Sequence, residues 1–239
     1  MAARTTAAVA WQLEHTVATA VWTRDSEPVE WIAAAIDTVV TGIHDLLDIA
    51  DWRDVHGEPW PEEREAQHRF VEARPVTVED QVLTSRGYAV HLFGPQLPSP
   101  DLDVNAGGVG AGARIPMHSA SLGFDPRYTP TPPRETVDDL VALAVRAWQP
   151  LLVAWTTAAV VQASGRHGWD VPAGYRVWIS PDVGTVTETA DGITARPLEG
   201  GTLITAPDSW DAPTVAHAVN ATLDANGLHD IRRSPEPTA

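Results

Sequence analysis

Residues 136–155 read TVDDLVALAVRAWQPLLVAW, and they place a helix directly before a buried strand. The apolar positions of the first part recur at intervals of three and four residues, the spacing that lines one face of a helix. They are Val137, Leu140, Val141, Ala144, Val145 and Trp148. Thr136 can cap the first turn, and Asp138 and Asp139 suit the positive end of the helix dipole. Pro150 disfavours helical geometry in the residue before it, so we expect the helix to end near Gln149 and 151–155 to form a strand.

Downstream of this unit the pattern predicts more strands and helices. We expect a short helix at 158–164, a strand at 175–179, and a hairpin of 193–198 and 202–205 around Glu199-Gly200-Gly201. Val215, Val219, Leu223 and Leu228 mark a last helix, with Gly227 as its cap. Residues 232–239 have little apolar content and read as a loose tail.

Upstream, alternation at Val9, Trp11 and Leu13 predicts one strand or a hairpin within 7–23. Ser26-Glu27-Pro28 is typical of a helix start, and a long amphipathic helix follows. Its apolar residues are Ile32, Ile36, Val39, Ile43, Leu46 and Leu47, and its polar side carries Asp37, Thr41, Asp45 and Asp48. The acidic stripe is expected to face solvent.

The middle of the chain predicts a short helix at 76–83 and strands at 87–93, 101–105 and 115–124. The glycine-rich run 107–112 fits neither the dinucleotide spacing nor the phosphate loop, so we interpret it as a hairpin connection. Residues 125–135 form a proline-rich linker. Together the segments predict one α+β domain over 1–231, with a mostly antiparallel sheet and about three principal helices.

Composition limits the classes of function. The net charge is −16, and all 16 basic residues are arginine. Such a chain repels nucleic acid and anionic membranes and favours a basic partner. Cysteine is absent, and 1–6 lead into no apolar core of the signal-peptide kind, so we expect a cytoplasmic protein. Residues 147–165 are uncharged, but Gln149, Pro150 and several threonines interrupt them, so we reject a membrane span.

The acidity is concentrated early in the chain, because residues 1–80 hold 16 acids and 6 arginines. Aromatic residues lie among the carboxylates, a mixture that is typical of a protein-binding surface. The alternative is a solvated face that keeps the protein in solution. On the charge pattern we predict partner contacts at Asp37, Asp45, Asp48, Asp51, Trp52, Asp54 and Glu58.

The sequence offers no motif for catalysis, a metal or a cofactor, and we predict none of the three. His44 with Asp48, and His167 with Asp170, supply two ligands each where a catalytic zinc usually takes three from the protein. His118 lies on a predicted strand near Ser119 and Ser121, without an orienting acid nearby in the sequence.

Over about residues 9–231 the chain resembles the immunity protein 52 family of bacterial polymorphic toxin systems. The resemblance is carried by 147–150 (AWQP) with the apolar run into Thr156-Thr157, by 174–180 (GYRVWIS), by 198–204 (LEGGTLI) and by 209–211 (SWD). The strands at 88–93 and 119–124 also match, whereas the loops at 94–104 and 125–135 and the insertion at 107–112 depart from the family.

The resemblance implies a non-catalytic antitoxin that binds a co-produced toxin in the cytoplasm, typically a nuclease. A nuclease presents positive charge to DNA phosphates, so a dense carboxylate surface suits its inhibitor. Two alternatives stay open: a structural or scaffold domain of a phage or secretion system, and a hydrolase whose site is built from distant His and Asp or Glu residues.

Overall fold

A computed structural model of the chain describes residues 9–24, 26–79, 81–95, 99–109 and 118–231. Over these residues eight strands form one antiparallel sheet in the order β4-β5-β6-β1-β7-β8-β10-β9. The strands are β1 (Thr16–Trp22), β4 (Tyr88–Phe93), β5 (Asp101–Ala106), β6 (His118–Phe124), β7 (Leu152–Thr157), β8 (Arg176–Ile179), β9 (Thr194–Leu198) and β10 (Gly201–Thr205). The α+β class with a mostly antiparallel sheet is confirmed.

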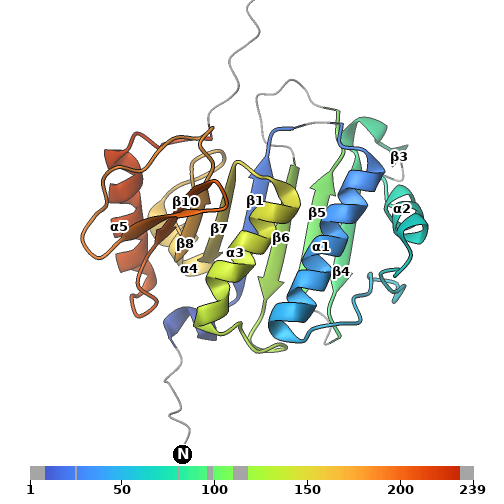
Figure 1. Cartoon of the computed structure of the whole chain (residues 1–239), viewed down its shortest axis with the longest axis horizontal. Helices are drawn as coiled ribbons and strands as arrows, with labels where there is room; N and C mark the ends of the chain where they lie inside the picture. The colour runs from blue at the N-terminus through green and yellow to red at the C-terminus, as the bar shows by residue number, and fades with distance from the viewer. Residues whose placement is uncertain (1–8, 25, 80, 96–98, 110–117, 232–239) are drawn as a thin grey trace, which may run out of the picture.

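Five α-helices belong to the described residues, and three of them are the principal ones. These are α1 (Val29–Leu47), α3 (Arg134–Trp148) and α5 (Ala212–Ala225), beside the shorter α2 (Arg64–Glu72) and α4 (Ala158–Ser164). Figure 1 shows α1 and α3 side by side across one face of the sheet. Along β1, alternate residues beginning with Thr16 are buried, and Ala18 lies beneath these helices. The opposite face over β4, β5, β6 and β1 carries exposed and half-buried side chains such as His91, Asp103 and Ser121.

The helix-to-strand unit at 136–155 is confirmed with small shifts. Helix α3 ends at Trp148, and Gln149 follows in the left-handed conformation with φ 46°. The end of the helix before Pro150 agrees with the prediction, although Gln149 is left-handed and not extended, the geometry that a following proline usually favours. The helix begins before Thr136, whose hydroxyl donates to the Pro133 carbonyl at 2.8 Å, so Thr136 is not the cap.

Tryptophans fill much of the core between the sheet and the two long helices. The rings of Trp22 and Trp148 stack 5.3 Å apart, and Trp11 meets Trp155 edge to face at 5.7 Å. All four are at most 1% exposed. Large buried rings of this kind contribute strongly to stability, since a fully buried large apolar side chain contributes about 1.5–3 kcal/mol.

The expected helix at 76–83 is wrong. Residues Thr77–Val78 (β2) and Gln81–Val82 (β3) pair as a short hairpin, and a 3₁₀ turn follows at Thr84–Arg86. Val78 and Val82 are 48% and 53% exposed, so the segment has no apolar face to bury and no tertiary reason to be helical.

One strand lies within 7–23, as expected, at β1, but it begins later than the alternation at Val9, Trp11 and Leu13 suggested. Ala10–Leu13 instead form a 3₁₀ helix, in which Trp11 turns into the core while Leu13 stays 70% exposed. Helix α2 was not expected, although Gln67, Phe70 and Val71 have the spacing of one helix face and are buried.

Parts of other expectations fall outside the described residues. They are the start of the 115–124 strand, residues 110–112 of the glycine-rich connection and the tail at 232–239. Among the helices that the structure describes, none combines the length and the hydropathy needed to cross a membrane.

Candidate protein-binding site

The structure separates the seven predicted contact residues into three groups. Asp45, Asp48, Asp51 and Glu58 are exposed, and Asp37 is half-buried. Trp52 and Asp54 are 2% and 3% exposed, so both lie in the interior and neither is available to a partner at the surface.

Asp54 organises the turn in which it lies. Its carboxylate accepts hydrogen bonds from the backbone N–H groups of His56 and Glu58, both at 2.9 Å, and from Arg74 at 2.5 Å. Burial opposes its ionisation, but Arg74 and the two amides outweigh that effect and hold the pKa of Asp54 below its ordinary value. The Arg74 guanidinium in turn lies over the Phe70 ring at 3.3 Å. Asp54 therefore joins the turn to Arg74, just beyond the end of α2.

Asp37 joins α1 to the segment that follows it. Its Oδ1 accepts hydrogen bonds from Trp60 Nε1 at 3.1 Å and from Gln67 Nε2 at 2.6 Å. Gln67 also donates to the Pro61 carbonyl at 3.0 Å. One carboxylate thus connects α1, the 48–62 segment and α2.

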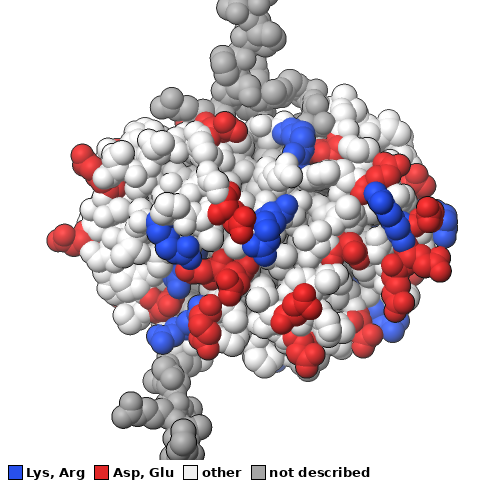
Figure 2. All heavy atoms as spheres, viewed as in Figure 1, with Lys and Arg blue, Asp and Glu red and all other residues white. Residues whose placement is uncertain are grey.

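A groove of about 380 Å³ lies between the outer side of α1 and this segment. We call it the acidic groove. It is lined by Asp37, Val40, Thr41, His44, Ile49, Ala50, Asp51, Trp52, Pro59, Trp60, Pro61 and Glu62. Three of these are carboxylates, and none of the described lining residues is an arginine. Figure 2 shows the wider setting, where acidic side chains gather along the side of the molecule that carries α2 and the segment leading to it.

Sequence reasoning found the acidic character of this region but missed part of its wall. Positions 37, 40, 41 and 44 lie on one face of α1 at helical spacing, which could have assigned His44 to the same surface. Trp60 and Glu62 could not be assigned from the sequence, because tertiary contacts place their segment against α1, among them the hydrogen bond from Trp60 to Asp37.

Asp48 and Asp51 also have backbone roles. Both adopt the left-handed conformation, with φ 56° and 59°, and Asp48 is the C-cap residue that follows the last residue of α1. Aspartate and asparagine tolerate this conformation better than most residues. His44 and Asp48 therefore do not form a side-chain pair on one helix face, although the Asp48 N–H donates to the His44 carbonyl at 2.8 Å.

A second groove, of about 360 Å³, lies on the face of the sheet opposite α1 and α3. Thr19, Ala154 and Thr156 contribute to its floor, and Val161 and Trp169, each 40% exposed, contribute to its walls. We call it the sheet-face groove.

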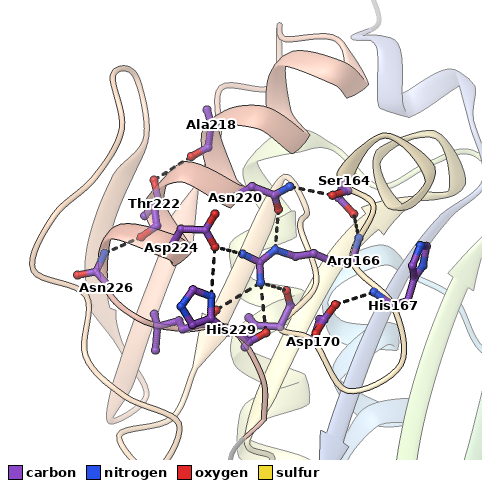
Figure 3. Close-up of polar contacts among 12 residues, drawn as sticks. Ser164, Arg166, His167, Asp170, Ala218, Asn220, Thr222, Asp224, Asn226 and His229 are labelled. Atoms are coloured by element: carbon purple, nitrogen blue, oxygen red, sulfur yellow. Dashed lines mark hydrogen bonds and ion pairs between the residues drawn. The ribbon is translucent and has the colours of Figure 1, made fainter.

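Arg166 and Asp170, the charged groups in the wall of the sheet-face groove, are bonded within the fold, as Figure 3 shows. The Arg166 side chain donates to Asn220 Oδ1 at 2.7 Å, to Asp224 Oδ1 at 2.5 Å and to the carbonyl oxygen of His229 at 3.3 Å. The backbone N–H of His167 donates to Asp170 Oδ2 at 2.9 Å. The His167 and Asp170 pair thus closes a turn, and Arg166 holds that turn to α5.

The histidine on β6 has a distant acid that the sequence did not reveal. His118 is 4% exposed, and its Nδ1 lies 3.2 Å from Oε2 of Glu27. Ser119 and Ser121 point to the opposite face of the sheet, so they do not meet this pair. Ser121 instead shares a hydrogen bond of 3.1 Å with Thr19. That the chain is not an enzyme stays a prediction.

Across the residues that the structure describes, no group of three or more histidine or carboxylate side chains could hold a metal ion. No family model and no curated protein sequence matches the chain. Among solved structures it is similar to the Pseudomonas aeruginosa T6SS protein PA0821, with a TM-score of 0.48 and 10% sequence identity. The match covers 92% of this chain and 78% of that one. The likeness assigns neither a family nor a function to the chain.

Proposed function

We propose that this protein is an immunity protein that neutralises a co-produced basic toxin, of the nuclease kind, by direct binding in the cytoplasm. The proposal rests on the resemblance to the immunity protein 52 family and on one structural observation. Asp45, Asp48, Asp51 and Glu58 are exposed carboxylates on α1 and on the segment that follows it, on a chain whose net charge is −16. Asp51 lines the acidic groove, and Glu58 forms an ion pair with Arg74 at 2.7 Å.

These carboxylates can assist binding through long-range attraction of a positively charged partner. Complementary charge steers a basic partner toward the acidic surface and disfavours other partners, and it affects association rate and specificity more than affinity. Exposed charges are screened beyond about 10 Å in 0.1 M salt, so association with a cationic partner should weaken as salt rises.

The proposed set of partner contacts differs from the set that the charge pattern predicts, because three residues leave it and two residues join it. Asp45, Asp48, Asp51 and Glu58 remain as charged contacts, and the lining of the groove adds Glu62 and Trp60. Three of the predicted contact residues have structural roles instead. Asp37 is hydrogen-bonded to Gln67 of α2, Asp54 is bonded to Arg74, and the Trp52 carbonyl accepts from the Trp60 N–H.

The experiment is co-expression with the protein encoded by the neighbouring reading frame. We expect growth rescue and a stoichiometric complex on co-purification. The variant Asp45→Asn, Asp48→Asn, Asp51→Asn, Glu58→Gln should lose both, and asparagine preserves the left-handed backbone at positions 48 and 51.

The matched control removes four exposed carboxylates elsewhere, as Glu135→Gln, Asp182→Asn, Glu188→Gln, Asp191→Asn. It changes the net charge by the same amount and should keep rescue. Failure of the unaltered protein to rescue growth or to bind the neighbouring product would contradict the proposed function.

A further inference from the structure

Asn226 is the one asparagine of the sequence that is followed by a glycine, Gly227. Glycine has no side chain to shield its backbone nitrogen, so this nitrogen can reach the side-chain amide carbon of the asparagine before it. We propose that Asn226 is a site of spontaneous deamidation, that the fold slows the reaction through the hydrogen bonds of its side chain, and that the product loosens residues 187–188 from the end of α5. The site is separate from the surface that the proposed function assigns to a partner.

Deamidation of Asn226 needs water as its only co-reactant. The Gly227 backbone nitrogen loses its proton to solvent base and bonds to Cγ of Asn226, and the bond from Cγ to Nδ2 breaks as ammonia leaves. One water molecule then opens the resulting cyclic imide. Addition of water at Cγ gives aspartate, and addition at the backbone carbonyl carbon gives isoaspartate. Both products carry a carboxylate in place of the side-chain amide.

The side-chain amide of Asn226 has hydrogen-bond partners on both of its polar atoms. Its Oδ1 accepts from the backbone N–H groups of Thr187 and Glu188, at 2.7 and 3.1 Å, and from the Thr187 hydroxyl at 3.2 Å. Its Nδ2 donates to the carbonyl oxygens of Glu188 and Thr222, both at 2.7 Å. Figure 3 shows the bond to Thr222. We call this set of bonds the Asn226 clasp.

The attacking nitrogen is held in place as well. The Gly227 N–H donates to the Asp224 carbonyl at 3.1 Å. The next residue, Leu228, is 3% exposed, and its N–H donates to the Leu223 carbonyl at 2.9 Å. Ring closure requires the Asn226 side chain to leave its partners and the Gly227 nitrogen to leave its acceptor. The reaction therefore requires local opening at the end of α5, and the free energy of that opening limits its rate.

Aspartate at position 226 cannot replace the amide in the Asn226 clasp. A carboxylate only accepts hydrogen bonds, so the two bonds that Nδ2 donates are lost. A charged oxygen then faces the carbonyl oxygens of Glu188 and Thr222, each of which lies 2.7 Å from Nδ2. The new charge also stands at the C-terminal end of α5, where the helix dipole disfavours an anion. The clasp is therefore weaker after deamidation.

Isoaspartate changes the backbone itself. Its main chain runs through Cβ and Cγ and is longer ahead of Leu228, whose carbonyl accepts a hydrogen bond from Arg166 at 3.4 Å. The change stays local, because the Ala190 N–H donates to the Thr222 hydroxyl at 3.0 Å without involving Asn226. We therefore expect residues 187–188 to loosen while Ala190 stays bound to α5.

The test incubates the full chain in alkaline buffer, with and without denaturing urea, and follows each asparagine by mass spectrometry of proteolytic fragments. Asn105 and Asn220 are internal controls, because each precedes an alanine. We expect conversion at Asn226 to exceed that of both controls in urea. In the folded protein it should slow by at least about tenfold, which corresponds to about 1.4 kcal/mol of local opening. Equal rates at Asn226 in the two conditions, or no excess over the controls in urea, would overturn the proposal.

Thr187→Val tests the Asn226 clasp directly, because it removes one donor and leaves Asn226 and Gly227 in place. We expect conversion of Asn226 in the folded protein to accelerate by at least about twofold, as the loss of one hydrogen bond implies. The matched control Thr185→Val makes the same change at an exposed position outside the clasp and should convert as the unaltered protein does. Unchanged conversion in Thr187→Val would show that the clasp does not restrain the reaction.

Asn226→Asp reproduces the product whose backbone is intact. Amide hydrogen exchange at Thr187 and Glu188 should accelerate by at least about fivefold, while exchange in β1 stays as it was. The control Gln81→Glu adds the same charge on β3, on the opposite side of the molecule from α5 (Figure 1), and should leave both amides unchanged. Equal protection of these amides in Asn226→Asp and the unaltered protein would overturn the predicted loosening.

Discussion

The carboxylate of Asp37 accepts a hydrogen bond from the indole of Trp60 at 3.1 Å. These residues lie on α1 and at the end of the 48–62 segment, and their bond closes the segment onto the helix. The bond forms the acidic groove and sets the direction of its aromatic wall. Asp37, which the charge pattern predicted as a partner contact, therefore acts first by holding Trp60 in position.

Replacing Asp37 by alanine should destabilise the fold, because Trp60 and Gln67 both lose their acceptor. We expect the free energy of unfolding to fall by about 1–3 kcal/mol. Urea denaturation measures this change. Asp45→Ala, at an exposed site on the same helix, should stay within about 0.5 kcal/mol of the unaltered protein. Equal losses in the free energy of unfolding for Asp37→Ala and Asp45→Ala would contradict a positioning role for Asp37.

The buried carboxylate of Glu27 predicts a dependence of stability on pH. Trp22 Nε1 donates to it at 2.6 Å and the Gly107 N–H at 3.0 Å, with His118 beside it. Burial opposes ionisation, but His118, Trp22 and the backbone outweigh it and hold the pKa of Glu27 below its ordinary value of 4.5.

A carboxylate with a lowered folded-state pKa contributes stability that is present above pH 4.5 and lost as the pH falls through the folded value. Glu27→Gln should therefore cost about 1–3 kcal/mol at pH 7 and progressively less below pH 4.5. Thermal unfolding across this pH range measures the difference. The exposed control Glu30→Gln should show no such convergence with the unaltered protein. A cost that stays constant with pH would contradict the assignment.

Arg176 joins three parts of the fold through a buried ion network. Its guanidinium donates to Asp138 Oδ1 at 2.6 Å and to Asp208 Oδ1 at 2.9 Å, and its side chain is 6% exposed. Arg176→Met leaves Asp208 without an arginine partner and Asp138 with Arg196 alone, so it should cost about 1.5–3 kcal/mol, the contribution of hydrogen bonds to charged groups.

The comparison for Arg176 is Arg196, which also binds Asp138 but has a side chain that is 47% exposed. Arg196→Met should cost less than about 1 kcal/mol, as is usual for exposed ion pairs. Chemical denaturation ranks the two variants. Similar losses in the free energy of unfolding for Arg176→Met and Arg196→Met would contradict the view that burial makes Arg176 the more important of the two arginines.

Arg166 should control the local stability of the wall of the sheet-face groove. Its bonds to Asn220, Asp224 and the His229 carbonyl hold residues 166–172 against α5. Arg166→Ala should raise amide hydrogen exchange in 166–172 while exchange in β1 stays as it was. Uniform acceleration across the protein would indicate a loss of global stability instead.

Sequence alone predicted the elements that local rules determine. Pro150 and the apolar spacing of 137–148 placed the end of α3 and the start of β7 within about two residues, the usual uncertainty of an element boundary. The helix expected at 76–83 failed because its spacing has no buried face in the fold, a tertiary property that the sequence does not display.

The candidate site could be predicted only as a region of the chain. The carboxylate run marked residues 37–58, but it could not separate Asp54 from Asp51. Asp54 is buried because Arg74, 20 residues later, returns to it from beyond α2. Trp52 and Asp54 thus differ from their exposed neighbours through contacts that no local pattern contains.

The central claim is that the exposed carboxylates of Asp45, Asp48, Asp51 and Glu58 bind a basic partner. The most direct test measures the dissociation constant for the neighbouring gene product at about 0.05 M and about 0.3 M salt. We expect Asp45→Asn, Asp48→Asn, Asp51→Asn, Glu58→Gln to weaken binding at low salt by at least about tenfold and to flatten the salt dependence. The Glu135, Asp182, Glu188, Asp191 control should match the unaltered protein. Identical dissociation constants for the unaltered protein and both variants at each salt concentration would contradict the claim.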